Sequence, residues 1–255
     1  MIKITALLIA LLTAAQAHGQ TWRFSGSASY ASGKYGGLTP VKTWYYPLTL
    51  RRQWDAWDAS VTTGLLSVET TNEASFIAGR AHRTQSGRRK LSVRSESGLA
   101  DVVTQGRYYL LQQTDATPNL DLTARIKWPT ADEKHGLGTG EHDFGIGIDI
   151  SHQAAEHWIG YFNWDYAFIG DPPGQDLSNQ TTVAFGLGRR IGSAELGVLF
   201  ENKTALIAGE SSSRLIEMAL SANVASRLKI LSSLGFGLSK GAPDTMFSGG
   251  LSASF

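Results

Sequence analysis

The chain has 255 residues, with 23 Lys or Arg against 22 Asp or Glu, so its formal net charge at pH 7 is +1. This balance gives a nucleic-acid partner no global electrostatic support, and we expect none. Cys is absent, which excludes a disulfide framework and a thiolate metal site.

The first residues have the pattern of a secretory signal. Lys3 supplies a positive charge, "ITALLIALLTAA" is a short apolar run, and Ala15-Gln16-Ala17 is a small-x-small cleavage site. The run is shorter than the roughly 20 apolar residues that a membrane helix needs. We therefore predict a cleaved signal peptide over 1–17 and one domain over 18–255.

After the signal, segment after segment alternates apolar and polar residues with a period of two, which predicts strands with two different faces. In "LDLTARIKWP" one parity is apolar from Leu120 to Trp128, and the other holds Asp121, Thr123, Arg125 and Lys127. Lengths of about ten residues exceed the roughly 5–6 of soluble strands and match strands that cross a bilayer at a tilt. The predicted strands are 22–30, 43–51, 57–66, 98–111, 120–129, 143–151, 157–169, 181–190, 194–203, 214–224, 227–239 and 246–255.

The links between these segments alternate in length, which a soluble sandwich has no reason to do. Links such as "HQAAE" and "IGS" are short, whereas "PTADEKHGLGTGEH" and the thirty or so residues of 67–97 are long. Bacterial outer-membrane barrels have short periplasmic turns and long extracellular loops. We therefore predict an all-β protein with a single antiparallel transmembrane β-barrel of about 12 strands. It would lie in a Gram-negative outer membrane, in contact with membrane lipid and lipopolysaccharide.

The last strand, "FSGGLSASF", runs to the final residue. A strand that ends there can pair with the first strand and leave no open edge. Phe255, with apolar residues at alternate positions before it, also resembles the C-terminal signal of bacterial outer-membrane proteins. That resemblance implies insertion by the barrel-assembly machinery.

The polar parity supplies candidates for the barrel interior. They are Asp101, Arg107, Arg125, Lys127, Asp149, Asp165, Glu195 and Glu217. Arg107, Arg125 and Lys127 form a basic ladder on two consecutive strands. In an open lumen this ladder would favour anionic solutes, and in a closed one it would pair with Asp149 or Asp165. A second basic group lies in the long link and would meet anionic lipid or solutes at the outer face; it comprises Arg80, Arg83, Arg88, Arg89, Lys90 and Arg94.

Signals for an enzyme are weak. "GLGTG" lacks the Lys-Ser/Thr of a phosphate loop and opens no helix pattern. In "EHD", Glu141 and Asp143 would share one face while His142 points away, so a metal cluster is disfavoured. A Ser–His lipase pair on the lipid face is the serious rival, but the His residues fall in links. We expect no catalytic residue, no cofactor and no metal.

One stretch resembles a known family. The motif residues are Lys127, Pro129, Thr130, Gly136, Leu137, Gly138, Thr139, Gly140 and Asp143, preceded by Asp101. They are similar to the outer-membrane proteins described as meta-pathway phenol-degradation proteins, which are labelled transporters. Ala100 and Ala131 depart from the glycines of that pattern, and the match covers about fifty residues.

The resemblance implies a channel or transporter for small molecules, with aromatic compounds as candidate solutes. The basic ladder adds anionic organic compounds to these candidates. The resemblance carries over no catalytic residue. The alternative is a surface barrel that transports nothing and acts through its extracellular loops, as an adhesin or an envelope structural protein.

Overall fold

A computed structural model of the chain describes residues 21–71, 74–77, 80–83 and 93–255, with side chains over 21–70 and 95–255. The predicted signal peptide lies outside the described residues and stays a prediction. Among the described residues, no helix is both long and apolar enough to cross a membrane. The strands are β1 (Thr21–Gly33), β2 (Val41–Gln53), β3 (Trp57–Thr71), β4 (Ala74–Ile77), β5 (Arg80–Arg83), β6 (Val93–Leu99), β7 (Val102–Leu111), β8 (Asn119–Trp128), β9 (Asp143–Ala155), β10 (Trp158–Phe168), β11 (Gln180–Ile191), β12 (Ala194–Lys203), β13 (Ser213–Ala225), β14 (Leu228–Gly237) and β15 (Thr245–Ser254).

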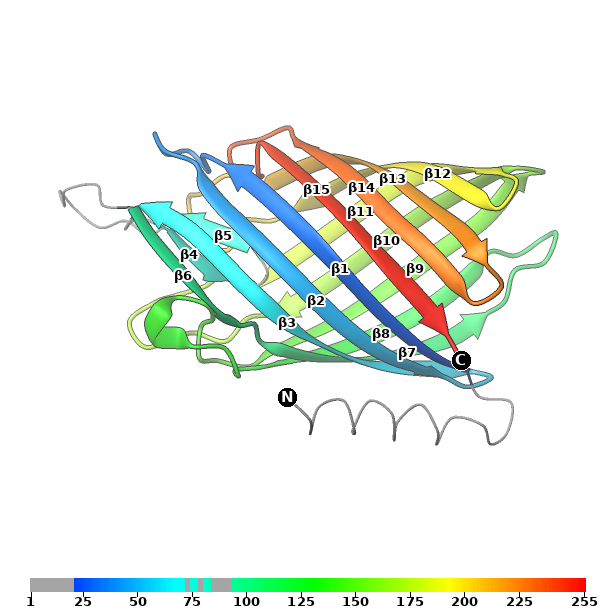
Figure 1. Ribbon diagram of the computed structural model, residues 1–255, viewed down its shortest axis with the longest axis horizontal. Helices are drawn as coiled ribbons and strands as arrows, with labels where there is room; N and C mark the ends of the chain where they lie inside the picture. Colours follow the sequence, from blue (N-terminus) through cyan, green and yellow to red (C-terminus); the bar gives the residue numbers. More distant parts are fainter. Residues whose placement is uncertain (1–20, 72–73, 78–79, 84–92) are drawn as a thin grey trace.

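The main sheet closes on itself as a barrel (Figure 1). β1 pairs antiparallel with β2 on one side and with the last strand, β15, on the other. At the end of this seam, Trp22 N donates to Phe255 O at 3.0 Å and Phe255 N donates to Trp22 O at 2.9 Å. The seam therefore has no open edge, as a sheet surrounded by lipid requires.

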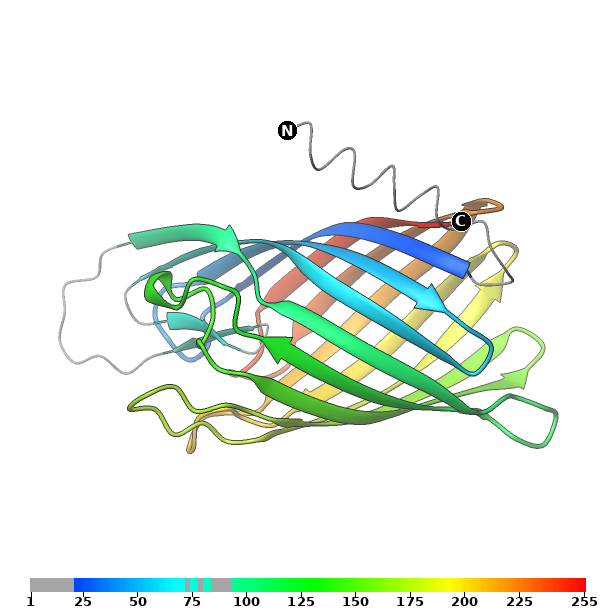
Figure 2. The same cartoon turned by 90° about the horizontal axis from the view of Figure 1, so that it is seen from below.

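The wall has the predicted 12 strands, because β6 and β7 are two parts of one strand that both pair with β3. Their division falls at Ala100 and Asp101. The predicted link 67–97 is wrong in part, since it contains the end of β3, the β4–β5 hairpin and most of β6. β4 and β5 have 4 residues each, too few for a period of two to stand out. The hairpin lies within the outline of the barrel in both Figure 1 and Figure 2.

Short turns and long loops lie at opposite ends of the barrel, as predicted. At the turn end, β9 and β10 are joined by 156–157 and β11 and β12 by 192–193. At the loop end, β8 and β9 are joined by 129–142, which contains the 3-10 turn η2 (Glu133–His135). β1 begins and β15 ends at the turn end.

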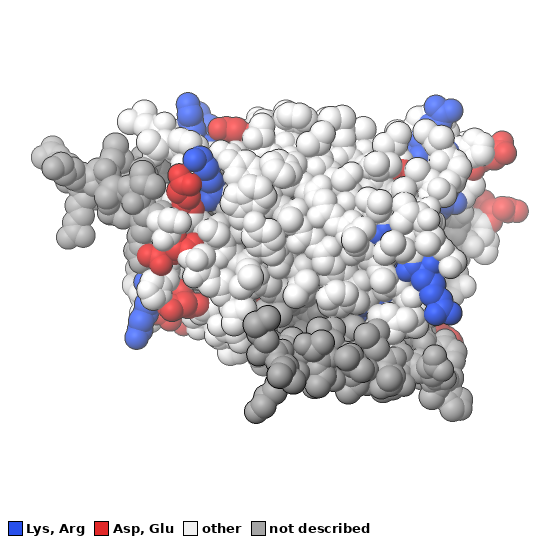
Figure 3. Space-filling model, in the orientation of Figure 1, with Lys and Arg blue, Asp and Glu red and all other residues white. Residues whose placement is uncertain are grey.

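The outer surface is apolar between the two ends. Large exposed side chains such as Leu122, Ile146 and Phe162 lie on the apolar parity of their strands. Figure 3 shows Lys, Arg, Asp and Glu gathered at the two ends and an uncharged band between them. At the turn end, Arg52 lies over the rings of Trp22 and Trp54, at 5.2 and 4.9 Å from their centroids. Such aromatic and cationic side chains are typical of a membrane–water interface.

Candidate functional site

The inner face of β7–β10 carries a layer of ion pairs. Arg107 lies 3.1 Å from Asp149 on β9 and 3.5 Å from Asp121 on β8. Arg125 on β8 donates from both terminal nitrogens to Asp165 on β10, at 2.5 Å each. A bidentate arginine–carboxylate contact of this kind fixes orientation as well as charge.

Glycines on β9 make room for that contact. Arg125 is paired with Gly145 in the sheet, and its side chain crosses β9 to reach Asp165 on the next strand. A Cβ placed on Gly145 would lie 2.8 Å from Arg125 Cγ. The pattern Gly145-x-Gly147 on the inner parity is therefore the local sequence feature that lets a side chain bridge two strands.

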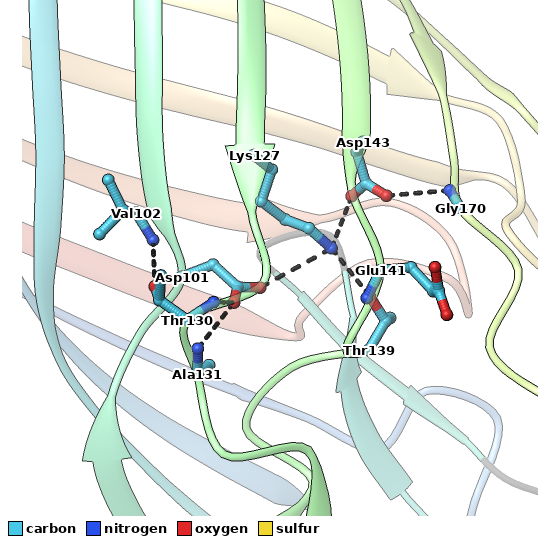
Figure 4. A network of polar contacts seen from close by, with 9 residues as sticks. All are labelled: Asp101, Val102, Lys127, Thr130, Ala131, Thr139, Glu141, Asp143 and Gly170. Carbon is cyan, nitrogen blue, oxygen red and sulfur yellow. Dashed lines mark hydrogen bonds and ion pairs between the residues drawn. The ribbon is translucent and has the colours of Figure 1, made fainter.

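Toward the loop end, Lys127 is the centre of a second network (Figure 4). Its Nζ lies 2.8 Å from Asp143 Oδ2 and 3.7 Å from Asp101 Oδ2, and it donates to Thr139 Oγ1 at 2.9 Å. Asp101 Oδ1 accepts from the backbone nitrogens of Thr130 and Ala131, at 3.0 and 2.9 Å. We call Asp101, Lys127, Thr139 and Asp143 the loop clamp, because together they hold both ends of the 129–142 loop.

The loop clamp places an apolar side chain inside the barrel. Leu137, at the tip of the 129–142 loop, packs in a buried cluster with Leu66, Val68 and Val41. In β3, Leu66 and Val68 share the inward parity of Asp58, so the loop reaches over the lumen. The interior is therefore narrowed by apolar residues at the loop end.

The motif that resembled a family now has a structural explanation. Asp101, Lys127, Thr130, Thr139 and Asp143 all make contacts within this network. Gly136 (φ 70°) ends η2 and Gly140 (φ 75°) follows it, both in the left-handed region that favours glycine. "GLGTG" forms a tight loop, as the sequence favoured.

A chain of cavities follows the inner wall from the turn end toward the middle of the barrel. The first, of about 530 Å³, shares Leu231 with a second of about 420 Å³. The second shares Tyr161 and Leu199 with a third of about 300 Å³. Glu195 and Glu217 line the second cavity, and Arg107 and Asp149 line the third. The interior thus keeps space beside the ion pairs.

The predicted interior residues lie on the inner face, but the basic ladder is not free. Arg107 and Arg125 are paired with Asp149 and Asp165, the partners expected for a closed lumen, while Lys127 is held by Asp101 and Asp143. Sequence reasoning did not select Asp121 or Asp143 as interior residues, although their inward parity would have identified both. Whether any of these residues lines a path for solutes stays a prediction.

Asp58 was also not selected as an interior residue, although it lies within the predicted strand 57–66. Asp58 lies on the inner parity of β3, where its Oδ2 accepts from the Tyr109 hydroxyl at 2.6 Å and its Oδ1 lies 3.6 Å from Arg51. Its side chain is only 3% exposed. The parity of β3 would have identified it.

Two other predicted groups are the cations of the long link and Phe255. Arg80 and Arg83 begin and end β5, and Arg94 is in β6. Arg88, Arg89 and Lys90 lie outside the described residues, so the basic group as a surface stays a prediction. Phe255 completes the barrel seam, and its role as an assembly signal stays a prediction.

The histidines and acids of the 129–142 region have structural contacts. Asp132 accepts at the start of η2 and lies 2.7 Å from His135, and this hydrogen bond lowers the pKa of Asp132. His142 packs against Trp128, whereas Asp143 points the other way and contacts Lys127 of the loop clamp, as the alternation predicted. Within the described part of the chain, no three His, Asp or Glu residues are placed to hold a metal ion.

Solved structures with this fold are outer-membrane barrels. The chain is similar to the COG4313 outer membrane channel from Pseudomonas putida F1, with a TM-score of 0.66 and 11% identity over 92% of this chain and 95% of that one. It is also similar to the KdgM porin, with a TM-score of 0.57 and 8% identity over 91% and 99%. The NanC porin has a TM-score of 0.56 and 11% identity over 90% and 98%.

At these identities the likeness shows the fold alone. The chain thus has the fold of outer-membrane β-barrels. No family model matches it, and no curated protein matches it either. Membership of the phenol-degradation family therefore stays a prediction.

Proposed function

We propose that the protein is an outer-membrane channel for small molecules. The observation that carries this proposal is the chain of cavities on the inner wall, which share lining residues from the turn end to the middle of the barrel. Barrels of about 8 strands are filled by side chains, and those of 16–18 strands leave a water-filled channel. The wall of this barrel has 12 strands, and its small inward residues lie beside a layer of paired charges. The space beside these residues suits solutes narrower than those that pass through the large porins.

The inward side chains differ in size and charge between opposite halves of the wall, which suits a channel. On β13, β14 and β15 the inward residues include Ser221, Ser233, Ser248 and Ser252, which are small. On β7–β10 they are long charged side chains held in ion pairs. The first two cavities therefore border the serine side, and the third lies against the ion pairs on the side opposite it.

Similar solved structures support the proposal through their fold, since they are described as a channel and as porins. By analogy with those proteins, we place the barrel in the outer membrane with its turn end in the periplasm. The resemblance in the 97–151 stretch favours aromatic organic solutes. The 129–142 loop, held by the loop clamp, would regulate entry from outside.

Conductance tests this proposal. We expect the purified barrel in a planar lipid bilayer to give discrete current steps in KCl, smaller than those of 16-stranded porins. A folded, heat-modifiable barrel that gives no current and admits no solute in a liposome-swelling assay would contradict it. That result would favour the surface-barrel alternative.

A further inference from the structure

The cavity at the turn end differs in charge from the rest of the interior. It has a volume of about 530 Å³ and is lined by Arg23, Arg51, Arg227 and Lys229. Of the described residues that line it, none is acidic. The four cations come from β1, β2, the β13–β14 turn and β14, so they surround the opening from several sides.

These cations are weakly neutralised. Arg51 lies 3.6 Å from Asp58, which also accepts a hydrogen bond from Tyr109. Arg23 Nε is 3.5 Å from the neutral Ser254 Oγ. Within the described part of the chain, the side chains of Arg227 and Lys229 form no ion pair with a carboxylate. The basic ladder on β7 and β8, in contrast, is fully paired.

Cations gathered around a concave opening, two of them without a carboxylate partner, focus the electrostatic potential and raise the local concentration of counter-ions. Guanidinium groups also match the planar, two-oxygen geometry of a carboxylate. We propose that this opening, rather than the ladder, is an anion-binding vestibule. We refer to Arg23, Arg51, Arg227 and Lys229 as the basic mouth.

The basic mouth also has an apolar wall. Leu231 is on the inward face of β14, yet 38% of it is exposed, and it forms the boundary with the next cavity. A cavity of about 150 Å³ is enough to hold benzene, so this opening admits a ring-sized body together with water. The ligand that fits both features is a small organic carboxylate, whose charge lies among the cations and whose apolar part contacts Leu231.

This inference rests on the proposed channel function for what happens after binding, when the anion moves along the adjoining cavities. Binding itself does not require conduction. The two ideas can therefore fail separately, and the test below measures both.

The test compares benzoate with benzyl alcohol, its neutral counterpart, as ligands of the full barrel in detergent. We expect benzoate to bind, with affinity falling as KCl is raised because exposed charges are screened, and benzyl alcohol to bind weakly. A variant with Arg23→Gln, Arg227→Gln and Lys229→Gln should bind benzoate about tenfold or more weakly. Arg189→Gln is the matched control, since Arg189 is a cation at the same end that lies outside the barrel over Trp158, 5.5 Å from its ring.

The same proteins are then recorded in a bilayer with a KCl gradient. We expect a reversal potential that shows anion preference in the wild type and in the control, and a loss of that preference in the triple variant. Equal benzoate affinity in the triple variant and the control would overturn the basic mouth as a site. Benzoate binding without any current would keep the basic mouth and refute the channel.

Discussion

Replacing Lys127 by Met tests whether the loop clamp holds the barrel together. The substitution keeps most of the length of the side chain but removes the one cation shared by Asp101 and Asp143. The side chains of these two carboxylates are only 13% and 10% exposed. Removing one partner of a buried ion pair costs roughly 3–5 kcal/mol. Water in the lumen reaches this site in part, so we expect a loss at the low end, about 3 kcal/mol.

The measurement is urea unfolding of the barrel in detergent micelles, followed by the fluorescence of its 7 Trp residues. Lys229→Met is the matched control, because Lys229 is an inner-face lysine without a carboxylate partner among the described residues, and its loss should be within about 0.5 kcal/mol. Adding Asp143→Asn to Lys127→Met should recover part of the stability by removing one unpaired charge. Equal losses of unfolding free energy in the two lysine variants would show that the loop clamp does not stabilise the barrel.

Three further variants test the interior and the two faces of the wall. Gly145→Val should lower the unfolding midpoint in urea, because its side chain would occupy the space that Arg125 crosses, whereas Gly249→Ala, with no atom within 4 Å of the added Cβ, should not; equal midpoints would contradict this. Ile146→Arg, on the lipid face, should cost roughly 2–4 kcal/mol of unfolding free energy in lipid vesicles, and Ser221→Arg, on the inner face, much less; the reverse order would mean that the assigned register is wrong. Arg125→Ala should lower thermal stability but leave the reversal potential at its wild-type value. If this variant instead loses its anion preference, the basic ladder and not the basic mouth determines the selectivity.

Much of the fold could be predicted from the sequence, because strands with one lipid face and one wet face have a strict period of two. That period located the strands of the wall, and it assigned the apolar parity from Leu120 to Trp128 outward and Asp149 inward. It also predicted the closing seam at Phe255, since a lipid-exposed sheet has to pair every edge. The β4–β5 hairpin was missed, because strands of 4 residues are too short for the pattern to show.

The candidate site was predicted less completely. Parity identifies which residues face inward, but it does not say which side chains meet across a curved wall. Arg125 reaches Asp165 two strands away only because Gly145 lies between them. Such three-dimensional placement decides that the ladder is fully paired, whereas Arg227 and Lys229 of the basic mouth have no carboxylate partner among the described residues. For this reason the sequence assigned anion preference to the ladder in an open lumen, whereas our proposal assigns it to Arg23 and Lys229.

We propose that solutes pass through the chain of cavities, of which the first two border the serine side of the wall. The absence of Cys makes this path directly testable. Ser233 faces inward and lines the second cavity, while its neighbour Leu234 faces outward and is 51% exposed. A membrane-impermeant thiol reagent is added to single channels of Ser233→Cys and Leu234→Cys. If solutes pass through the cavities, the current should fall stepwise in Ser233→Cys and stay unchanged in Leu234→Cys. Unchanged current in both variants, with labelling of Ser233→Cys verified by mass spectrometry, would contradict it.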